Sequence, residues 1–192
     1  EQTAPQVIAS ILQRNGLRGP DFRQVLKDPG VYRQRSFICQ YQESDLAFIS
    51  RWMEREGMYY FFDHSNEAAG DGLVMTDYKE GQPSDAIELR YTPPENVQTD
   101  RQDSCVTSFT WRKKHISANV LVQDFNYRKA SMGDNLKGNH KVAGGSRGDV
   151  MYYGGNLRNE DEAGRLARVR SEELACAGSV FQGEAPAMGV RS

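Results

Sequence analysis

The segment Tyr41–His64 joins a capped amphipathic helix directly to an aromatic strand, and this junction constrains the fold of the chain more than any other feature. Ser44 is a preferred N-cap residue, Asp45 places negative charge in the first turn, and Gly57 can adopt the left-handed conformation that ends a helix. Because no spacer separates helix and strand, the chain must turn sharply at Gly57 and pack the two elements against each other.

One face of this predicted helix is apolar. The apolar residues that recur at helical spacing are Leu46, Phe48, Ile49, Trp52 and Met53. Arg51, Glu54 and Arg55 fall on the face that we expect to meet water. The strand that follows Gly57 is bulky on both faces, since it contains Tyr59, Tyr60, Phe61 and Phe62. Helix and strand leave few polar groups for a small ligand, so we interpret the segment as a scaffold and interface element.

The N-terminal half predicts the order helix, strand, helix, strand, strand. Thr3 and Gln6 form a capping box before a helix that ends at Gly16, and Phe22, Val25 and Leu26 form a small apolar cluster after it. Tyr32–Tyr41 alternates in the manner of a strand. The two segments predicted to form a hairpin after the central helix are Met58–His64 and Leu73–Tyr78.

The C-terminal half has a different pattern. The segments that alternate as strands are Ala86–Tyr91, Val106–Lys114 and Ala118–Tyr127. Residues 130–157 are rich in Gly, Ser and Asn and predict a long surface loop, while Asn159 with Glu162 opens a last helix that runs to Gly178. We therefore predict an α+β fold with an α/β domain over residues 1–91 and a β-barrel segment over residues 92–192, incomplete at its C-terminus.

Composition excludes several classes of protein. The chain has 192 residues, 38% of them hydrophobic, and a net charge of -2, so no overall field attracts nucleic acid or an anionic membrane. No apolar run reaches the roughly 18 residues that span a bilayer, and the polar N-terminus is not a signal peptide. Cys39, Cys105 and Cys176 are scattered and odd in number, which indicates reduced thiols and folding in a bacterial-type cytoplasm. Cys39 lies in a predicted strand and Cys176 on a predicted helix, so we expect both to be buried as small apolar residues.

The residues of the central helix and strand resemble a known family. Glu43–Arg51 and Met53–Phe62 are similar to the signature of VgrG proteins, the spike proteins of type VI secretion systems, which are related to phage late control protein D and to contractile-tail baseplate hubs. The resemblance extends more weakly over Leu73–Asp77, Val106–Phe109 and Arg165–Glu173. The residues that carry the signature are Asp45, Phe48, Ile49, Arg51, Trp52, Glu56, Gly57, Tyr59, Tyr60, Phe61 and Phe62.

The resemblance implies a structural role. The first domain would be the baseplate-like part of a hub, and the later strands would belong to an antiparallel, tube-forming β-barrel of the phage tail hub type. The full-length protein would be a homotrimer that adapts a sixfold, Hcp-like tube protein to a threefold spike for cell puncture, with a tip protein and effectors as further partners. It would be assembled in the bacterial cytoplasm and exported to the outside or into a target cell, without stable membrane insertion of this segment.

Two other function classes stay open beside the hub, which itself belongs either to a secretion system or to a phage or prophage tail. A hydrolytic effector or surface-polymer-binding protein needs a catalytic cluster, and His64 with Asp63 and Asp77 is the nearest approach to one. A nucleic-acid binder would use the basic aromatic stretch Trp111–His115, whereas His140 has no identifiable partner. The glycine-rich segment 144–148 lacks the rest of a phosphate-binding loop and is interpreted as flexible. The sequence predicts no enzyme, cofactor, metal site or nucleic-acid partner.

Overall fold

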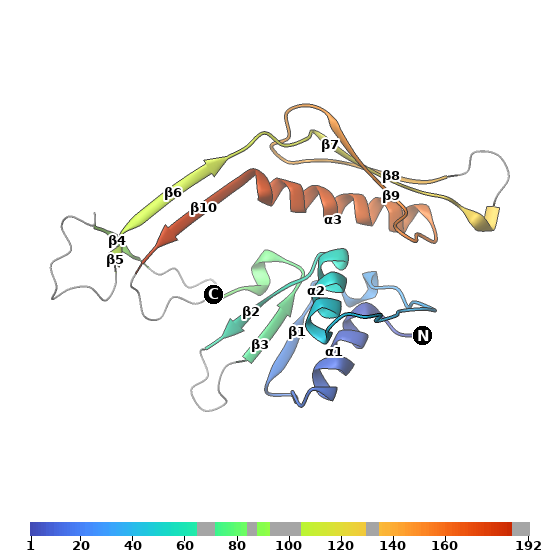
Figure 1. Cartoon of the computed structure of the whole chain (residues 1–192), viewed down its shortest axis with the longest axis horizontal. Helices are drawn as coiled ribbons and strands as arrows, with labels where there is room; N and C mark the ends of the chain where they lie inside the picture. Colours follow the sequence, from blue (N-terminus) through green and yellow to red (C-terminus); the bar gives the residue numbers. More distant parts are fainter. Residues whose placement is uncertain (65–71, 84–87, 93–104, 130–134, 186–192) are drawn as a thin grey trace. The chain divides into compact units, whose positions relative to one another are not determined.

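The computed structural model describes residues 1–64, 72–83, 88–92, 105–129 and 135–185. The chain divides into two compact units, Glu1–Ile87 and Glu88–Met188, and each has its own cluster of buried apolar residues. Figure 1 shows helices and strands in both units, so the α+β class is confirmed.

The N-terminal unit is a small mixed sheet with two helices. Its helices are α1 (Ala4–Arg14) and α2 (Asp45–Glu56), and its strands are β1 (Phe22–Val25), β2 (Tyr59–Asp63) and β3 (Gly72–Thr76). The strand order is β1-β3-β2, with β3 parallel to β1 and antiparallel to β2. Short 3-10 turns lie at Pro29–Val31 and Lys79–Gly81. The predicted hairpin is therefore confirmed, and the capping box of Thr3 and Gln6 begins α1 as expected.

The prediction of a strand at Tyr32–Tyr41 is wrong. Strand β1 instead lies at Phe22–Val25, which the sequence indicated only as an apolar cluster. Among the described residues, the segment after the Pro29–Val31 turn forms one isolated β-bridge, between Arg35 and Gln2, instead of a strand. Tyr32 is buried, and its hydroxyl donates to Asp77 at 2.8 Å.

The C-terminal unit packs one long helix on a three-stranded sheet. The helix α3 (Glu160–Gly178) covers the sheet β8-β7-β9, which comprises β7 (Asn119–Asp124), β8 (Leu136–Lys141) and β9 (Asp149–Tyr153). The Asn159 side chain accepts from the Glu162 amide at 3.0 Å, which confirms the predicted N-cap. A 3-10 turn spans Tyr127–Lys129.

A separate two-stranded ribbon continues from α3. Strand β10 (Ser179–Glu184) follows the helix directly and pairs antiparallel with β6 (Ser108–Lys113), as Figure 1 shows. The short strands β4 (Arg90–Tyr91) and β5 (Cys105–Val106) pair with each other. Part of the strand predicted at Ala86–Tyr91 lies outside the described residues.

Residues 130–157 were expected to form a loop, and this prediction is wrong. Within the described part of that stretch lie β8 and β9, and the turn between them is held by backbone hydrogen bonds such as Gly145 to Val142 at 3.0 Å. The glycine-rich segment 144–148 is thus an ordered turn, in which Gly144 and Gly148 have positive φ angles of 75° and 81°. Composition suggested a loop because glycine and polar residues alternate here with few apolar ones.

The strands of the C-terminal unit pair both in parallel and in antiparallel fashion, whereas the resemblance implied an antiparallel barrel. Strand β7 is antiparallel to β8 but parallel to β9, and β4 is parallel to β5. Each sheet among the described residues has two or three strands. Strand β9 is parallel to β7 because the chain reverses direction in β8. After the turn that follows β8, the chain crosses to the opposite edge of β7 and again runs in the direction of β7.

Candidate functional site

The signature helix α2 begins and ends as its sequence predicts. The Ser44 hydroxyl accepts from the Ala47 amide at 3.2 Å, and Gly57 ends the helix in the left-handed conformation with φ 73°. The Met58 amide donates to the Met53 carbonyl at 2.8 Å, so β2 begins immediately after the helix. A side chain at Gly57 would strain this turn, because non-glycine residues rarely adopt such a φ angle.

Asp45 fastens α2 to its neighbours through three side chains. Its carboxylate accepts from Asn15 at 2.7 Å, from Gln40 at 2.8 Å and from Arg14 at 2.8 Å. These donors come from the end of α1 and from the segment that precedes α2. The hydrogen bonds from Asn15, Gln40 and Arg14 lower the pKa of Asp45 from 3.8 to about 2, because they favour the ionised carboxylate.

Acid should therefore weaken the N-terminal unit through Asp45. The pKa of this carboxyl is depressed in the folded state, so its contribution is complete above the unfolded value of 3.8 and is lost as pH falls toward about 2. We expect the unfolding free energy to fall less steeply with acid in Asp45→Asn than in the parent chain within this window. Urea unfolding at several pH values measures both slopes, and equal slopes would contradict the role of Asp45.

Trp52 lies at the centre of the buried face of α2. Its side chain is 8% exposed, and its ring centroid is 6.4 Å from that of Phe48. Three guanidinium groups lie over the Trp52 ring, with distances to its centroid of 5.2 Å for Arg35, 5.6 Å for Arg55 and 5.8 Å for Arg51. The face of an indole ring attracts cations, so these contacts add to the apolar burial.

The charged signature residues of α2 form ion pairs. Glu56 is 5% exposed and pairs with Arg35 at 3.2 Å, which joins the end of the helix to the irregular segment before it. Arg51 pairs with Glu43 at 2.6 Å across the start of the helix, and the hydrogen bond from Arg51 lowers the pKa of Glu43. Both ion pairs join segments of the N-terminal unit, so these charged side chains stabilise its fold.

The aromatic signature residues of β2 are placed differently from the sequence expectation. Met58 is buried, but Tyr59, Tyr60 and Phe62 are 37%, 46% and 43% exposed. Strand β2 is at the edge of its sheet, with β3 as its neighbour. Leu46, which belongs to the predicted apolar stripe, is 66% exposed because it lies in the first turn, away from the core. Phe48, Ile49, Trp52 and Met53 are buried as predicted.

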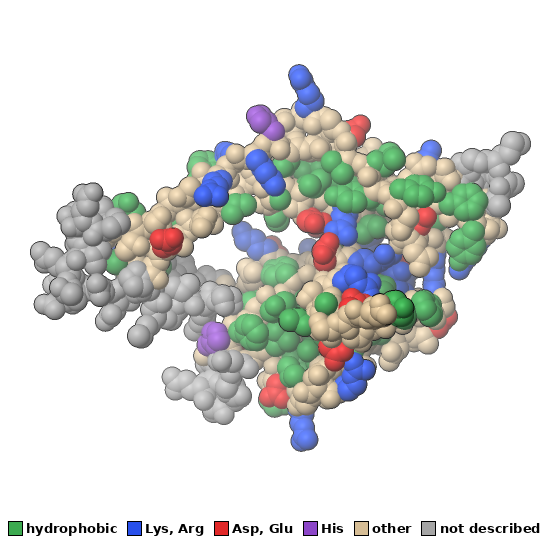
Figure 2. Space-filling model, in the orientation of Figure 1, with side chains coloured by type: hydrophobic (Ala, Val, Ile, Leu, Met, Phe, Trp, Pro, Cys, Tyr) green, Lys and Arg blue, Asp and Glu red, His purple; other side chains and the backbone are tan. Residues whose placement is uncertain are grey.

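The β6/β10 ribbon exposes three aromatic side chains. Phe109, Trp111 and Phe181 are 61%, 54% and 59% exposed, and all residues of β10 are exposed. Their rings stack, with centroids 5.8 Å apart for Phe109 and Phe181 and 5.5 Å apart for Trp111 and Phe181. Figure 2 shows one face of the molecule, on which apolar side chains lie on the surface among charged ones. The alternation of aromatic residues in Ser108–Lys113 is the sequence signal that marks this surface.

The β6/β10 ribbon has two strands and exposed aromatic side chains, as expected of a sheet to which further strands can be added. A two-stranded ribbon has marginal stability in water by itself, and exposed apolar patches on folded proteins commonly mark contact surfaces. The π system of Trp111 is engaged within the chain, by Phe181 and by the Lys113 ammonium at 4.1 Å from its centroid. The Trp111 indole N–H donates to the Ser179 hydroxyl at 2.9 Å. These contacts order the Trp111 ring within the ribbon.

The two carboxylates considered beside His64, those of Asp63 and Asp77, make contacts with β1 and the segment that follows it. Asp63 pairs with Arg23 at 2.7 Å, and Asp77 accepts from the Lys27 amide and the Tyr32 hydroxyl, each at 2.8 Å. Both carboxylates thus fasten β1 and its neighbouring segment to the rest of the unit.

His140 has a partner, contrary to the sequence expectation. Its Nδ1 atom lies 2.8 Å from the buried hydroxyl of Ser171 and 2.9 Å from the Lys141 carbonyl. The Ser171 hydroxyl also donates to the Arg168 carbonyl at 2.7 Å. The contact between His140 and Ser171 therefore joins β8 to α3.

The burial predicted for Cys39 and Cys176 is wrong. Cys105 is buried, but Cys39 and Cys176 are exposed, since neither lies on the buried side of a strand or helix. All three thiols are free. Within the described residues, no group of three or more His, Cys, Asp or Glu side chains is placed to hold a metal ion.

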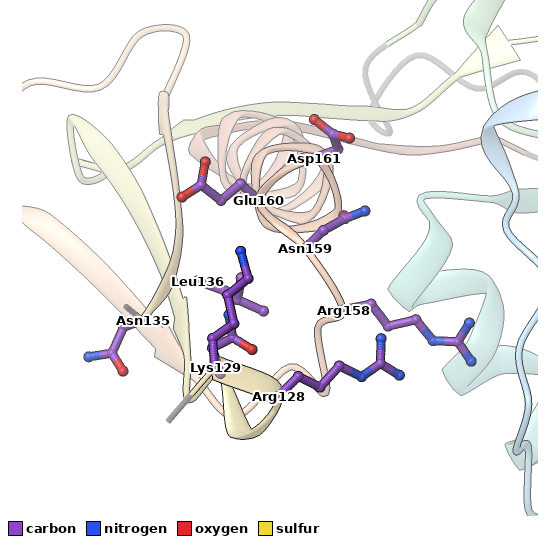
Figure 3. A pocket seen from close by; sticks show the side chains of 9 residues that line it. Arg128, Lys129, Asn135, Leu136, Arg158, Asn159, Glu160 and Asp161 are labelled. Atoms are coloured by element: carbon purple, nitrogen blue, oxygen red, sulfur yellow. The ribbon is translucent and has the colours of Figure 1, made fainter. Parts of the chain in front are cut away.

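A cavity of about 490 Å³ lies at the start of α3. Figure 3 shows Arg128 and Arg158 extending toward the same side of it. Glu160 and Asp161 also line the cavity, so carboxylates offset much of its positive charge. The helix start is already capped by Asn159, which leaves the cavity without a defined anion-binding geometry.

No helix in the described ranges combines the length and the apolar character that crossing a bilayer requires.

Comparison with known proteins gives a consistent result. Residues 1–192 match the phage tail baseplate hub (GPD) family. The type VI secretion system spike protein VgrG1b of Pseudomonas aeruginosa is 26% identical over 178 residues, which cover 90% of this chain and 23% of that protein. The actin cross-linking toxin VgrG1 of Vibrio cholerae is 29% identical over 129 residues, covering 67% of this chain and 11% of the toxin.

A solved structure has the same fold at low sequence identity. The 43 kDa tail protein of prophage MuSo2 from Shewanella oneidensis matches with a TM-score of 0.53 and 10% identity, over 94% of this chain and 48% of that protein. The chain thus spans only a minor part of the spike proteins that it matches and about half of the prophage tail protein.

Proposed function

Because this chain belongs to the phage tail baseplate hub family, we propose that it is a structural segment of the hub of a contractile injection machine, specifically of a type VI secretion spike. The match over the whole chain carries this proposal. Its relatives are named as spike and tail proteins, and the named toxin matches over only 11% of its own length. The proposed role is mechanical rather than enzymatic.

The proposed mechanism requires rigid units, and surfaces that other subunits cover in the assembly. In the full-length protein, three copies would form a ring that joins a sixfold tube protein to a threefold spike, with a tip protein and effectors at the spike end. The N-terminal unit, Glu1–Ile87, would be the baseplate-like part, and the remaining residues would contribute to a tube-forming β-barrel. The ion pairs of α2 and the close packing of α3 support a segment that transmits axial force without deforming.

The exposed β6/β10 ribbon supports an assembly role for the C-terminal unit. Its stacked aromatic rings are ordered by contacts within the chain but remain more than half exposed. In the assembled hub, we propose that further strands cover this side of the ribbon and complete the sheet. The machine would be assembled in the bacterial cytoplasm and then export this protein toward a target cell.

Loss of the ribbon aromatics should impair assembly while leaving the fold of the chain intact. In the full-length protein, Trp111→Ser combined with Phe181→Ser is expected to shift the mass measured by light scattering from a trimer toward a monomer. Circular dichroism checks that secondary structure is kept. Phe37→Ser is the matched control, because Phe37 is 76% exposed but lies in the other unit. A monomeric parent protein would contradict the trimeric hub, whereas an unaffected trimer in the double variant would contradict only the role of the ribbon.

A phage or prophage tail hub is the second candidate, favoured by the shared fold of the prophage tail protein. The two candidates differ in what fails when the hub is lost. In a secretion system, deletion of the full-length protein should abolish export of the tube protein, and in a prophage it should abolish formation of infectious particles. A strain that loses neither property would contradict both.

A further inference from the structure

We draw no further inference here: the strongest candidate, the exposed aromatic side of the β6/β10 ribbon, already belongs to the assembly surface proposed above, and nothing in the structure shows which segment or subunit covers it.

Discussion

Replacing Trp52 with alanine should lower the unfolding free energy of the N-terminal unit by about 3–5 kcal/mol, the range for truncating a large buried aromatic residue. Trp52 packs beside Phe48 and under three guanidinium groups, so the substitution leaves a cavity and removes the surface on which those cations lie. Hydrogen exchange of the amides in α1 and α2 measures this loss within the unit, as an increase in rate of roughly 10² to 4 × 10³-fold for the most protected amides.

Two substitutions make the Trp52 experiment specific. Trp52→Phe keeps most of the buried apolar area and removes the indole N–H, which is buried without a hydrogen-bond partner among the described residues, so it should cost much less than the alanine variant. Leu46→Ala changes the same helix at a side chain that is 66% exposed, and we expect an effect within about 0.5 kcal/mol. Unchanged protection in Trp52→Ala would reject the placement of this residue in the core.

Replacing Gly138 with alanine should destabilise the C-terminal unit by about 3 kcal/mol, at the upper end of the usual range for overpacking. Gly138 lies in β8 directly beneath α3, and a Cβ atom there would collide with the carbonyl group of Ala163 and lie 2.6 Å from the Gly164 nitrogen. The colliding atoms belong to the backbone, so no side-chain rotation can relieve the contact. The helix must move away from the sheet that it covers.

The neighbouring glycine of α3 provides the matched control for Gly138. A Cβ atom at Gly164 meets nothing within 4 Å, so Gly164→Ala should stabilise the helix by about 0.5–1 kcal/mol. Hydrogen exchange in α3 and β7 should therefore accelerate in Gly138→Ala and slow in Gly164→Ala. The amides of α1 and α2 should be unaffected in both variants, because the two units have separate cores. Equal protection in the two variants would contradict close packing of α3 on β8.

The Trp52→Ala and Gly138→Ala substitutions should each destabilise a different unit. Trp52→Ala should expose the N-terminal unit to exchange and leave α3 protected, while Gly138→Ala should do the opposite. Loss of protection throughout the chain from either substitution would show that the two units unfold together. The result bears on the proposed mechanical role, because a hub segment must keep its parts folded under load.

The sequence by itself determined the local elements of this protein. The Ser44 cap, the Gly57 stop and the apolar face with Trp52 specify α2, and the caps at Thr3 and Asn159 specify the other two helices. These signals lie within a few residues of each other, so local backbone geometry is enough to read them. The residues of α2 also carried the family resemblance, which the match over the whole chain confirms.

Only the tertiary structure decided which strands pair and which side chains are covered. Residues 22–25 form a strand because β3 lies beside them, whereas in the segment 32–41 the side chains of Tyr32 and Arg35 contact Asp77 and Glu56. Strands β8 and β9 depend on pairing with β7. Gly138 of β8 permits the close approach of α3, and Gly145 of the turn between the two strands permits that of the 117–118 backbone. Strand pairing joins residues distant in sequence, and the exposure of the β2 and ribbon aromatics depends on what packs around them. Neither is encoded in a local pattern.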